Sequence, residues 1–340
     1  MFTAVFGSFE SGIIYAIMAL GVYLTFRVLD FPDLTVDGSF VTGAAVAATL
    51  IINGNDPFFA TVVAIVAGFI AGCLTGILHT YGKINPLLSG ILMMIALYSI
   101  NLRIMDTPNI PLFSQETAFT NVAGITEKLG IDGALNKMLT FFGLGNEDLP
   151  QTWAIILLMI IVTFFIKFVT DRFLQTEVGL ALRATGDNQR MIRSLSANTN
   201  VLIILGLGIS NSMVALSGAL IAQYNGFADV GMGIGMIIIG LASVIIGEAL
   251  FGTKTIVRTT FAVVFGAIIY RLVVSFALRV EFLEAGDLKI ITATIVIIAL
   301  IMPKVIEAFK ERKRKAERQQ HFLNKQVVDK KEGENGVTLK

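Results

Sequence analysis

The sequence predicts an all-α polytopic membrane protein with about nine transmembrane helices (roughly 8–10), some of them broken. Of its 340 residues, 55% are hydrophobic and 15% are charged, whereas soluble domains carry about 25% charged residues. Its mean hydropathy is +0.77. Apolar runs approach the roughly 20 residues that a helix needs to cross a bilayer. Because these runs are continuously apolar, they exclude an outer-membrane β-barrel, whose strands alternate over about 10 residues.

The runs and the polar segments between them define the expected domains. The apolar runs lie near residues 11–29, 37–52, 58–78, 87–103, 152–169, 201–222, 234–250, 257–279 and 289–308. Several are short, which favours tilted or broken helices packed in a bundle. We expect a transmembrane domain over 1–308, with an external loop at 104–150 and a cytoplasmic segment at 170–200. A basic cytoplasmic tail, expected to be disordered and to touch anionic lipid, would follow at 309–340.

The positive charges predict the orientation. No Lys or Arg precedes the first run, and the first positive charge, Arg27, follows it, so we expect an uncleaved span with its N-terminus outside. Alternating through nine spans places about 20 of the 26 Lys and Arg residues on one side. That side is therefore expected to be cytoplasmic and to hold the C-terminus. We expect no nucleic-acid partner for the basic tail.

The scarce reactive side chains exclude several kinds of chemistry. With 1 Cys and 2 His, the chain lacks the residues for a disulfide framework, a Cys/His zinc site or a haem motif. We expect no metal, no cofactor and no enzymatic activity in this chain. Gly68, Gly72 and Gly76 place small residues on one face of the third run, which favours close approach of another backbone.

Residues 176–193 form the most informative polar segment. Met191, Ile192 and Leu195 make an apolar stripe beside several arginines. Gly179 and Gly186 are expected to break the segment into short pieces, the second starting at an N-cap, Asp187 or Asn188. A short amphipathic helix of this kind fits a groove on a soluble partner. It also fits an interfacial helix lying on lipid headgroups, and both readings stay open.

Three motifs carry a resemblance to a known family. The pattern Gly179-x-x-x-Arg183-Ala-x-Gly186-x-Asn188 resembles the coupling segment of permease subunits of bacterial ATP-binding-cassette importers, in the ribose and branched-chain amino acid branch. Residues 240–252 are similar to a glycine-rich element of that family, with Glu248 where relatives commonly have glycine. The acidic segment 29–39, with 224–233, looks most like a subgroup for uptake of tryptophan and related amino acids. The resemblance covers roughly residues 5–305.

The resemblance implies a bacterial cytoplasmic-membrane importer with several partners. These are a second copy of the chain, cytoplasmic ATPase subunits that bind ATP and Mg²⁺, and an extracellular or periplasmic substrate-binding protein. Residues 247–255 superficially resemble a phosphate-binding loop, but Thr253 separates Gly252 from Lys254, so the pattern is not met. The residues that would couple to the ATPase are Glu177, Gly179, Arg183, Ala184, Gly186, Asn188 and Arg190.

Polar residues inside the apolar runs are the candidates for the substrate path, because charge there is costly and faces the bundle interior or water. Asp30, Asp33 and Asp37 surround Pro32, which loosens a helix. The segment could contribute to a gate or form a solvated cytoplasmic turn, and both stay open. For Arg271 we consider a structural ion pair with Glu248, with contact to the substrate as the alternative. The candidates for the path or gate are Asp33, Asp37, Tyr98, Asn101, Asn211, Tyr224, Asn225 and Glu248.

The preferred function is thus that of a permease subunit that moves an amino acid, with an aromatic one such as tryptophan as first candidate, by alternating access. The alternatives are a stand-alone ion-coupled transporter and an importer of the same class for a sugar or nucleoside. Spans two to four and seven to nine run in opposite senses, which is compatible with an inverted repeat.

Overall fold

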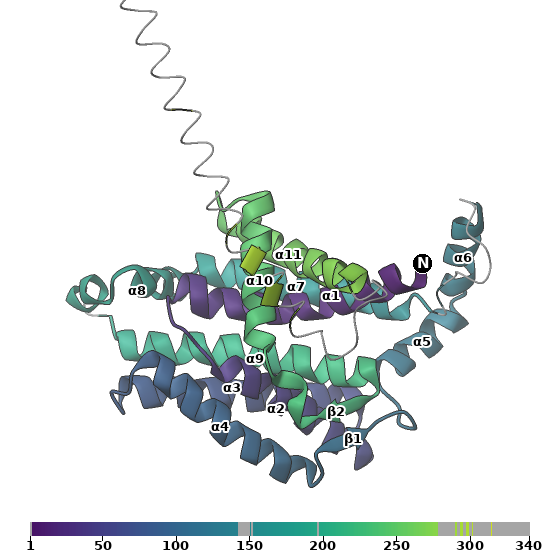
Figure 1. The fold of residues 1–340 in the computed structure, drawn as a ribbon, viewed down its shortest axis with the longest axis horizontal. Helices are drawn as coiled ribbons and strands as arrows, with labels where there is room; N and C mark the ends of the chain where they lie inside the picture. Colours follow the sequence, from purple (N-terminus) through teal and green to yellow (C-terminus); the bar gives the residue numbers. More distant parts are fainter. Residues whose placement is uncertain are drawn as a thin grey trace, which may run out of the picture. The chain divides into compact units, whose positions relative to one another are not determined.

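The computed structural model describes residues 2–141, 150, 152–195 and 197–277, with isolated positions beyond. In these ranges the chain is almost wholly helical, and eight helices are long and apolar enough to cross a membrane (Figure 1). The predicted all-α polytopic fold is confirmed. The expected ninth span, 289–308, and the tail, 309–340, lie largely outside the described residues. The chain divides into two compact units at 292/293, and every element named below belongs to the first.

The first half of the chain contributes four spanning helices. Their bounds are α1 (Phe2–Tyr23), extended by the π-helical turn η1 (Leu24–Val28), α2 (Thr35–Ile52), α3 (Pro57–Thr80) and α4 (Pro86–Met105). Asp56 and Asn85 cap α3 and α4 by accepting hydrogen bonds from main-chain N–H groups. A proline follows each cap at the first helical position, where its missing N–H costs nothing. These local signals explain why the starts of α3 and α4 match the predicted runs.

The second half contributes four more. Its helices are α7 (Ala154–Gln175), α8 (Glu177–Ser194), α9 (Thr199–Asn225), α10 (Met236–Phe251) and α11 (Ile256–Ala277), with the 3₁₀ turn η3 (Val230–Gly233) before α10. Of these, α8 is polar and does not span. In Figure 1, α8 lies at one end of α1 and α9, and α5 and α6 lie at the other.

The expected external loop contains structure of its own. Residues 104–150 include β1 (Asn109–Pro111), α5 (Ala118–Lys128) and α6 (Ile131–Phe141). β1 pairs antiparallel with β2 (Phe227–Asp229), with Ile110 opposite Ala228. This pairing fastens the loop to the chain that leaves α9.

The core of the bundle is the antiparallel pair α1 and α9. Ser210 donates to the carbonyl oxygen of Gly21 at 2.7 Å, and Ser217 donates to that of Ile14 at 2.9 Å. α3 also packs on α9. A Cβ added at Gly72 would lie 2.2 Å from the Leu207 carbonyl oxygen. The small-residue face of α3 therefore lets two backbones approach, as predicted.

The contacts among these helices have the form of an inverted repeat. α3 packs on α9, and α11 packs on α1; likewise α2 packs on α3 and α9, while α10 packs on α11 and α1. In both halves a long helix is followed by a non-helical connector and a shorter helix of 18 or 16 residues. Since α1 and α9 are antiparallel, α1–α3 and α9–α11 are related in opposite senses, which is the arrangement common in transport folds.

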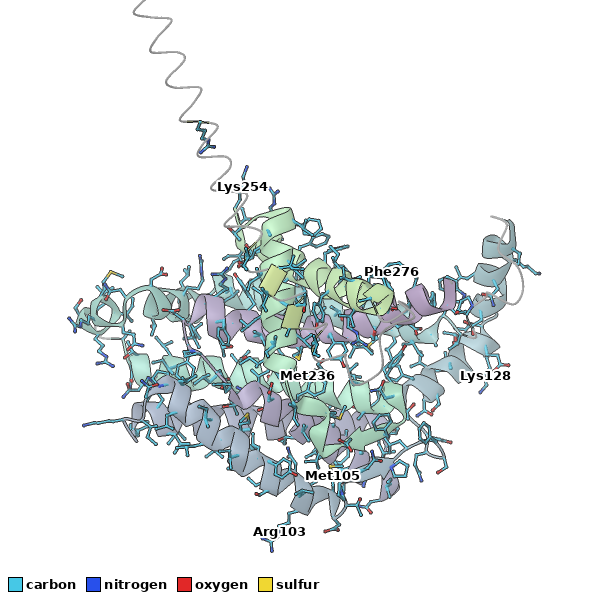
Figure 2. All side chains as sticks on the ribbon, in the orientation of Figure 1. Arg103, Met105, Lys128, Met236, Lys254 and Phe276 are labelled. Carbon is cyan, nitrogen blue, oxygen red and sulfur yellow. The ribbon has the colours of Figure 1, made fainter. Side chains whose placement is uncertain are left out.

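The two short helices begin inside the bundle. Figure 2 labels Met236, the first residue of α10, near the middle of the molecule and Lys254 beyond the other end of that helix. A Cβ added at Gly233 would lie 2.1 Å from the main-chain oxygen of Asp37 in the first turn of α2. The chain entering α10 therefore packs directly on the start of α2, and this junction positions the candidate site.

Candidate substrate cavity and coupling helix

α8 consists of two pieces. Thr176 caps the first by accepting from Gly179 N at 3.2 Å. Asn188 has non-helical dihedrals, φ −159° and ψ 92°, and its Oδ1 accepts from Met191 N at 3.1 Å, so it caps the second piece. The expected break, with an N-cap at Asp187 or Asn188, is confirmed, and the cap is Asn188. Gly179 and Gly186, the residues expected to break the segment, instead lie within the first helical piece.

The first piece of α8 packs on the end of the first membrane span. A Cβ added at Gly186 would lie 2.1 Å from the carbonyl oxygen of Val28. Leu182 is fully buried nearby, with Ala184 half-buried. At the other end of the piece, Gly179 has the main chain of Leu174 within 2.6 Å of its Cβ position. Both glycines are thus required by close approach, and neither contact leaves room for a side chain.

The charged residues Glu177, Arg183 and Arg190 of α8 are exposed, and so is the uncharged cap residue Asn188. Arg183 also lines a hollow of about 580 Å³ with Arg27, Glu248 and Lys254, among others. This end of the bundle therefore presents a largely basic surface, on which Glu248 is ion-paired with Arg27.

After η1 the chain turns back into the bundle. Asp30, with φ +51°, is exposed, but Asp33 is fully buried. Asp33 Oδ2 accepts from Asn211 Nδ2 at 2.7 Å, and Oδ1 accepts from Thr35 N at 2.9 Å. Because Asn211 lies near the middle of α9, connector 29–34 is not a solvated turn at Asp33. It is non-helical backbone held inside protein.

Asp37 joins the two short helices. Its Oδ2 accepts from Gly235 N at 2.9 Å and its Oδ1 from Ile237 N at 2.8 Å. These are donors at the start of α10, which a helix leaves unsatisfied by its own backbone. A carboxylate there also complements the positive end of the helix dipole. Asp37 of α2 is therefore the N-terminal cap of α10, supplied from nearly 200 residues away in the chain.

A cavity of about 390 Å³ opens beside Asp37, between α2, α4 and the chain from η3 to α10. Its volume lies in the range of about 300–1,000 Å³ typical of small-molecule sites. Two predicted path residues, Tyr98 and Asn101 of α4, line it with Asp37. Its remaining wall is mainly apolar and includes Val41, Met94, Ile95, Val230 and Ile234.

Comparison with known proteins settles the class. Residues 4–302 match the model of the branched-chain amino acid transport system permease component. The chain belongs to this permease family. It is 44% identical over 285 residues, 84% of this chain and 86% of the relative, to a tyrosine transport system permease protein of Clostridioides difficile.

Two other relatives agree with this membership. An uncharacterised protein of Rickettsia prowazekii is 33% identical, covering 86% of the permease and 94% of the relative. A Methanocaldococcus jannaschii protein described as a probable branched-chain amino acid transport permease is 25% identical, covering 62% and 64%. No solved structure matches the permease.

Several predicted path residues of the permease lie away from the cavity. Asp33 and Asn211 hydrogen-bond to each other in the core. Tyr224 donates to Glu10 Oε2 at 3.1 Å, and Asn225 is exposed at the end of α9. Glu248 is ion-paired with Arg27 beside α8. The structure therefore gathers Asp37, Tyr98 and Asn101 and separates the other five from them.

Arg271 does not pair with Glu248. Its Nε donates to Ser11 Oγ at 3.2 Å, and its guanidinium lies 4.7 Å from the ring centroid of Tyr15. Glu248 has a different partner because it lies near the C-terminal end of α10, whereas Arg271 contacts Ser11 and Tyr15 in the first half of α1. The cation–π contact replaces the ion pair that we considered from the sequence.

Sequence reasoning missed two groups of residues. Met94, Ile95 and Ile234 of the cavity wall are ordinary apolar residues, and nothing in their spacing distinguishes them from lipid-facing ones. Lys167 and Asp171 form a buried ion pair at 2.6 Å within α7, and Thr260 donates to Asp171. Their i,i+4 spacing inside an apolar run was a signal that could have found this pair. Within the described ranges, no three metal-ligating side chains gather.

Proposed function

We propose that this permease is the membrane-spanning subunit of an ATP-driven importer and that α8 transmits movement of separate ATPase subunits to the cavity. The observation that carries the proposal is an unbroken series of contacts. Gly186 packs on Val28, connector 29–34 leads from Val28 to Asp33, and α2 then presents Asp37 to α10 and the cavity. A shift of α8 would move connector 29–34 and α2 as well, because close-packed backbones leave no free space between them.

The exposed charges of α8 support a docking role. Glu177, Arg183 and Arg190 make no ion pair within the described chain, so they are available to a partner of complementary charge. In the proposal, ATP and Mg²⁺ bind to the ATPase subunits, and this chain carries no cofactor. Two copies of the permease and an external binding protein complete the assembly, in a bacterial cytoplasmic membrane.

The proposed orientation places α8 in the cytoplasm and the N-terminus outside. Arg27, Lys83, Arg183 and Lys254 gather with α8 at one end of the bundle. Loops rich in Lys and Arg stay in the cytoplasm, which supports this assignment. The acidic residues Asp106 and Asp229, next to β1 and β2, lie at the opposite end.

We propose an aromatic amino acid as cargo. The relative from C. difficile is described as a tyrosine transport permease, at 44% identity. The apolar wall of the cavity is compatible with such a side chain. Tyrosine and tryptophan are therefore the first compounds to test, with branched-chain amino acids, sugars and nucleosides as the comparison panel.

Arg183→Glu tests the docking role. In vesicles containing the permease, its cognate ATPase subunits and binding protein, we expect substrate-stimulated ATP hydrolysis and uptake to fall about tenfold or more, because a reversed charge repels its partner. Membrane insertion should be unchanged. Lys128→Glu, at the exposed end of α5, is the matched control and should transport normally. Wild-type coupling in Arg183→Glu would overturn the role proposed for α8.

A second candidate, a stand-alone ion-coupled transporter, is favoured by one observation. Glu10, Asp33 and Asp37 are acidic residues held within the bundle without an ion pair in the described chain, and such groups serve as coupling sites in secondary transporters. This candidate requires that the permease alone move solute, which the ATP-driven importer does not do.

A further inference from the structure

The polar atoms of the cavity beside Asp37 accept hydrogen bonds more than they donate them. The Asp37 carboxylate lines it, and no Lys or Arg is among its lining residues in the described chain. The nearby main-chain donors of α10 are already taken by Asp37. The site is therefore unsuited to an anionic group and suited to a cation or another hydrogen-bond donor.

Asn101 adds an unused acceptor. The residue is fully buried and lines the cavity, and its Nδ2 donates to the carbonyl oxygen of Gly38 at 3.2 Å. Its Oδ1 has no hydrogen-bond partner among the residues that the structure describes. Buried amide oxygens are nearly always paired, so an unpaired one beside a cavity marks a place for a ligand donor.

The apolar wall of the cavity suits a flat apolar group. Val41, Met94, Ile95 and Ile234 supply aliphatic and thioether surface, and Tyr98 supplies a ring. Thioethers and aromatic rings both make favourable contacts with aromatic side chains. Ligand sites typically combine such an apolar wall with a few convergent polar groups.

We propose that this cavity is a binding subsite in the permease itself, which takes an aromatic amino acid by its ammonium group and its side chain. The ammonium group donates to Asp37 and to Oδ1 of Asn101, and the ring lies on Met94 and Tyr98. The carboxylate is left toward the open mouth. The inference rests on the proposed transport of amino acids and adds that the permease, not only its binding protein, recognises the cargo.

Ligand binding to the full-length permease in lipid nanodiscs tests this directly. Saturation-transfer NMR detects even weak binding of L-tyrosine. Two analogues distinguish recognition of its ammonium group from recognition of its carboxylate. Tyramine keeps only the ammonium group, and 3-(4-hydroxyphenyl)propionate keeps only the carboxylate. We expect saturable binding of L-tyrosine that tyramine displaces and the propionate does not. No saturable binding, or displacement by the propionate instead of tyramine, overturns the subsite.

Two variants place the binding in this cavity. Ile95→Trp fills it, and Tyr98→Ala removes the exposed ring, so we expect affinity for L-tyrosine to fall about tenfold in each. Leu92→Trp is the matched control, since Leu92 is an exposed residue of α4 outside the cavity lining, and it should bind as wild type. If Tyr98→Ala and Ile95→Trp both fold and bind like the control, the cavity is not the site.

Transport by the complete assembly separates this inference from the function on which it rests. ATP-driven uptake of L-tyrosine by wild type, together with absent binding to the permease, would leave the proposed function standing and overturn only the subsite. If the permease binds L-tyrosine saturably and tyramine displaces it, but the complete assembly shows no ATP-driven uptake, the subsite stands and the proposed function is overturned.

Discussion

Gly186 in α8 lies against the main chain of Val28 at the end of η1, so close that a Cβ on the glycine would come within 2.1 Å of the Val28 carbonyl oxygen. Val28 is followed by the connector that carries Asp33 into the core, and then by α2 with Asp37. This close contact joins the polar helix at one end of the bundle to the chain that forms the cavity.

Gly186→Ala should disturb this contact. Overpacking costs about 1–3 kcal/mol where the neighbour is backbone and cannot move aside. We therefore expect α8 to be displaced from η1, with transport per ATP hydrolysed falling severalfold in the reconstituted assembly. Gly124→Ala, in α5, is the matched control because nothing lies within 4 Å of its Cβ position. Normal coupling in Gly186→Ala would argue against transmission through Val28.

Asp37→Asn tests the link between α2 and α10. Hydrogen bonds to charged groups contribute about 1.5–3 kcal/mol, and Asp37 accepts from Gly235 N and Ile237 N. Losing the charge should lower the melting temperature of the permease and reduce transport. The measurement is thermal unfolding in detergent together with uptake.

Asp56→Asn is the control for Asp37→Asn. Asp56 caps α3 through Phe58 N and Phe59 N at an exposed position, and Asn is as good a cap there. It should change neither stability nor uptake appreciably. If Asp37→Asn and Asp56→Asn change melting temperature and uptake equally, Asp37 contributes no more than a cap within a single helix, and the link between α2 and α10 is not supported.

Lys167→Met tests the buried ion pair of α7. Removing the cation leaves the Asp171 carboxylate buried with Thr260 as its remaining side-chain partner among the described residues, which should destabilise the permease by about 3–5 kcal/mol. Asp171→Asn added to Lys167→Met should recover most of the loss. Arg172→Met, at the exposed neighbouring position, should cost little. A double variant no more stable than Lys167→Met would show that the pairing is not the cause.

Much of this fold could be predicted from the sequence because its signals are local. Apolar runs gave eight of the spans, Gly68, Gly72 and Gly76 marked the face of α3 that packs on α9, and Asn188 marked the break in α8. The start of α1 was predicted too late, at residue 11, because Glu10 is polar. In the structure Glu10 is buried and accepts from Tyr224.

The cavity could be predicted only in part, because long-range contacts define it. Asp37, Tyr98 and Asn101 stood out as polar residues in apolar runs, and the structure brings them together. Glu248 stood out for the same reason, yet its partner is Arg27. A charged residue in an apolar run indicates that a partner is needed, but which residue is the partner depends on how helices far apart in the chain pack together.

The orientation of the permease can be checked by labelling single cysteines in intact cells. In a Cys73→Ser background, Gly124→Cys lies in α5 and Asn188→Cys lies in α8, at opposite ends of the bundle. A membrane-impermeant maleimide added from outside should label Gly124→Cys and not Asn188→Cys. Labelling of Asn188→Cys but not of Gly124→Cys would show that the orientation is the opposite of the proposed one, with α8 outside the cell and out of reach of cytoplasmic ATPase subunits.

Uptake by the permease alone, compared with the complete assembly, is the most direct test of ATP-driven transport. Vesicles would contain either the permease alone, with proton or sodium gradients imposed, or the permease with its cognate ATPase subunits, ATP and binding protein. We expect accumulation of labelled L-tyrosine only in the complete assembly and only with ATP hydrolysis. Gradient-driven accumulation by the permease alone would contradict the account.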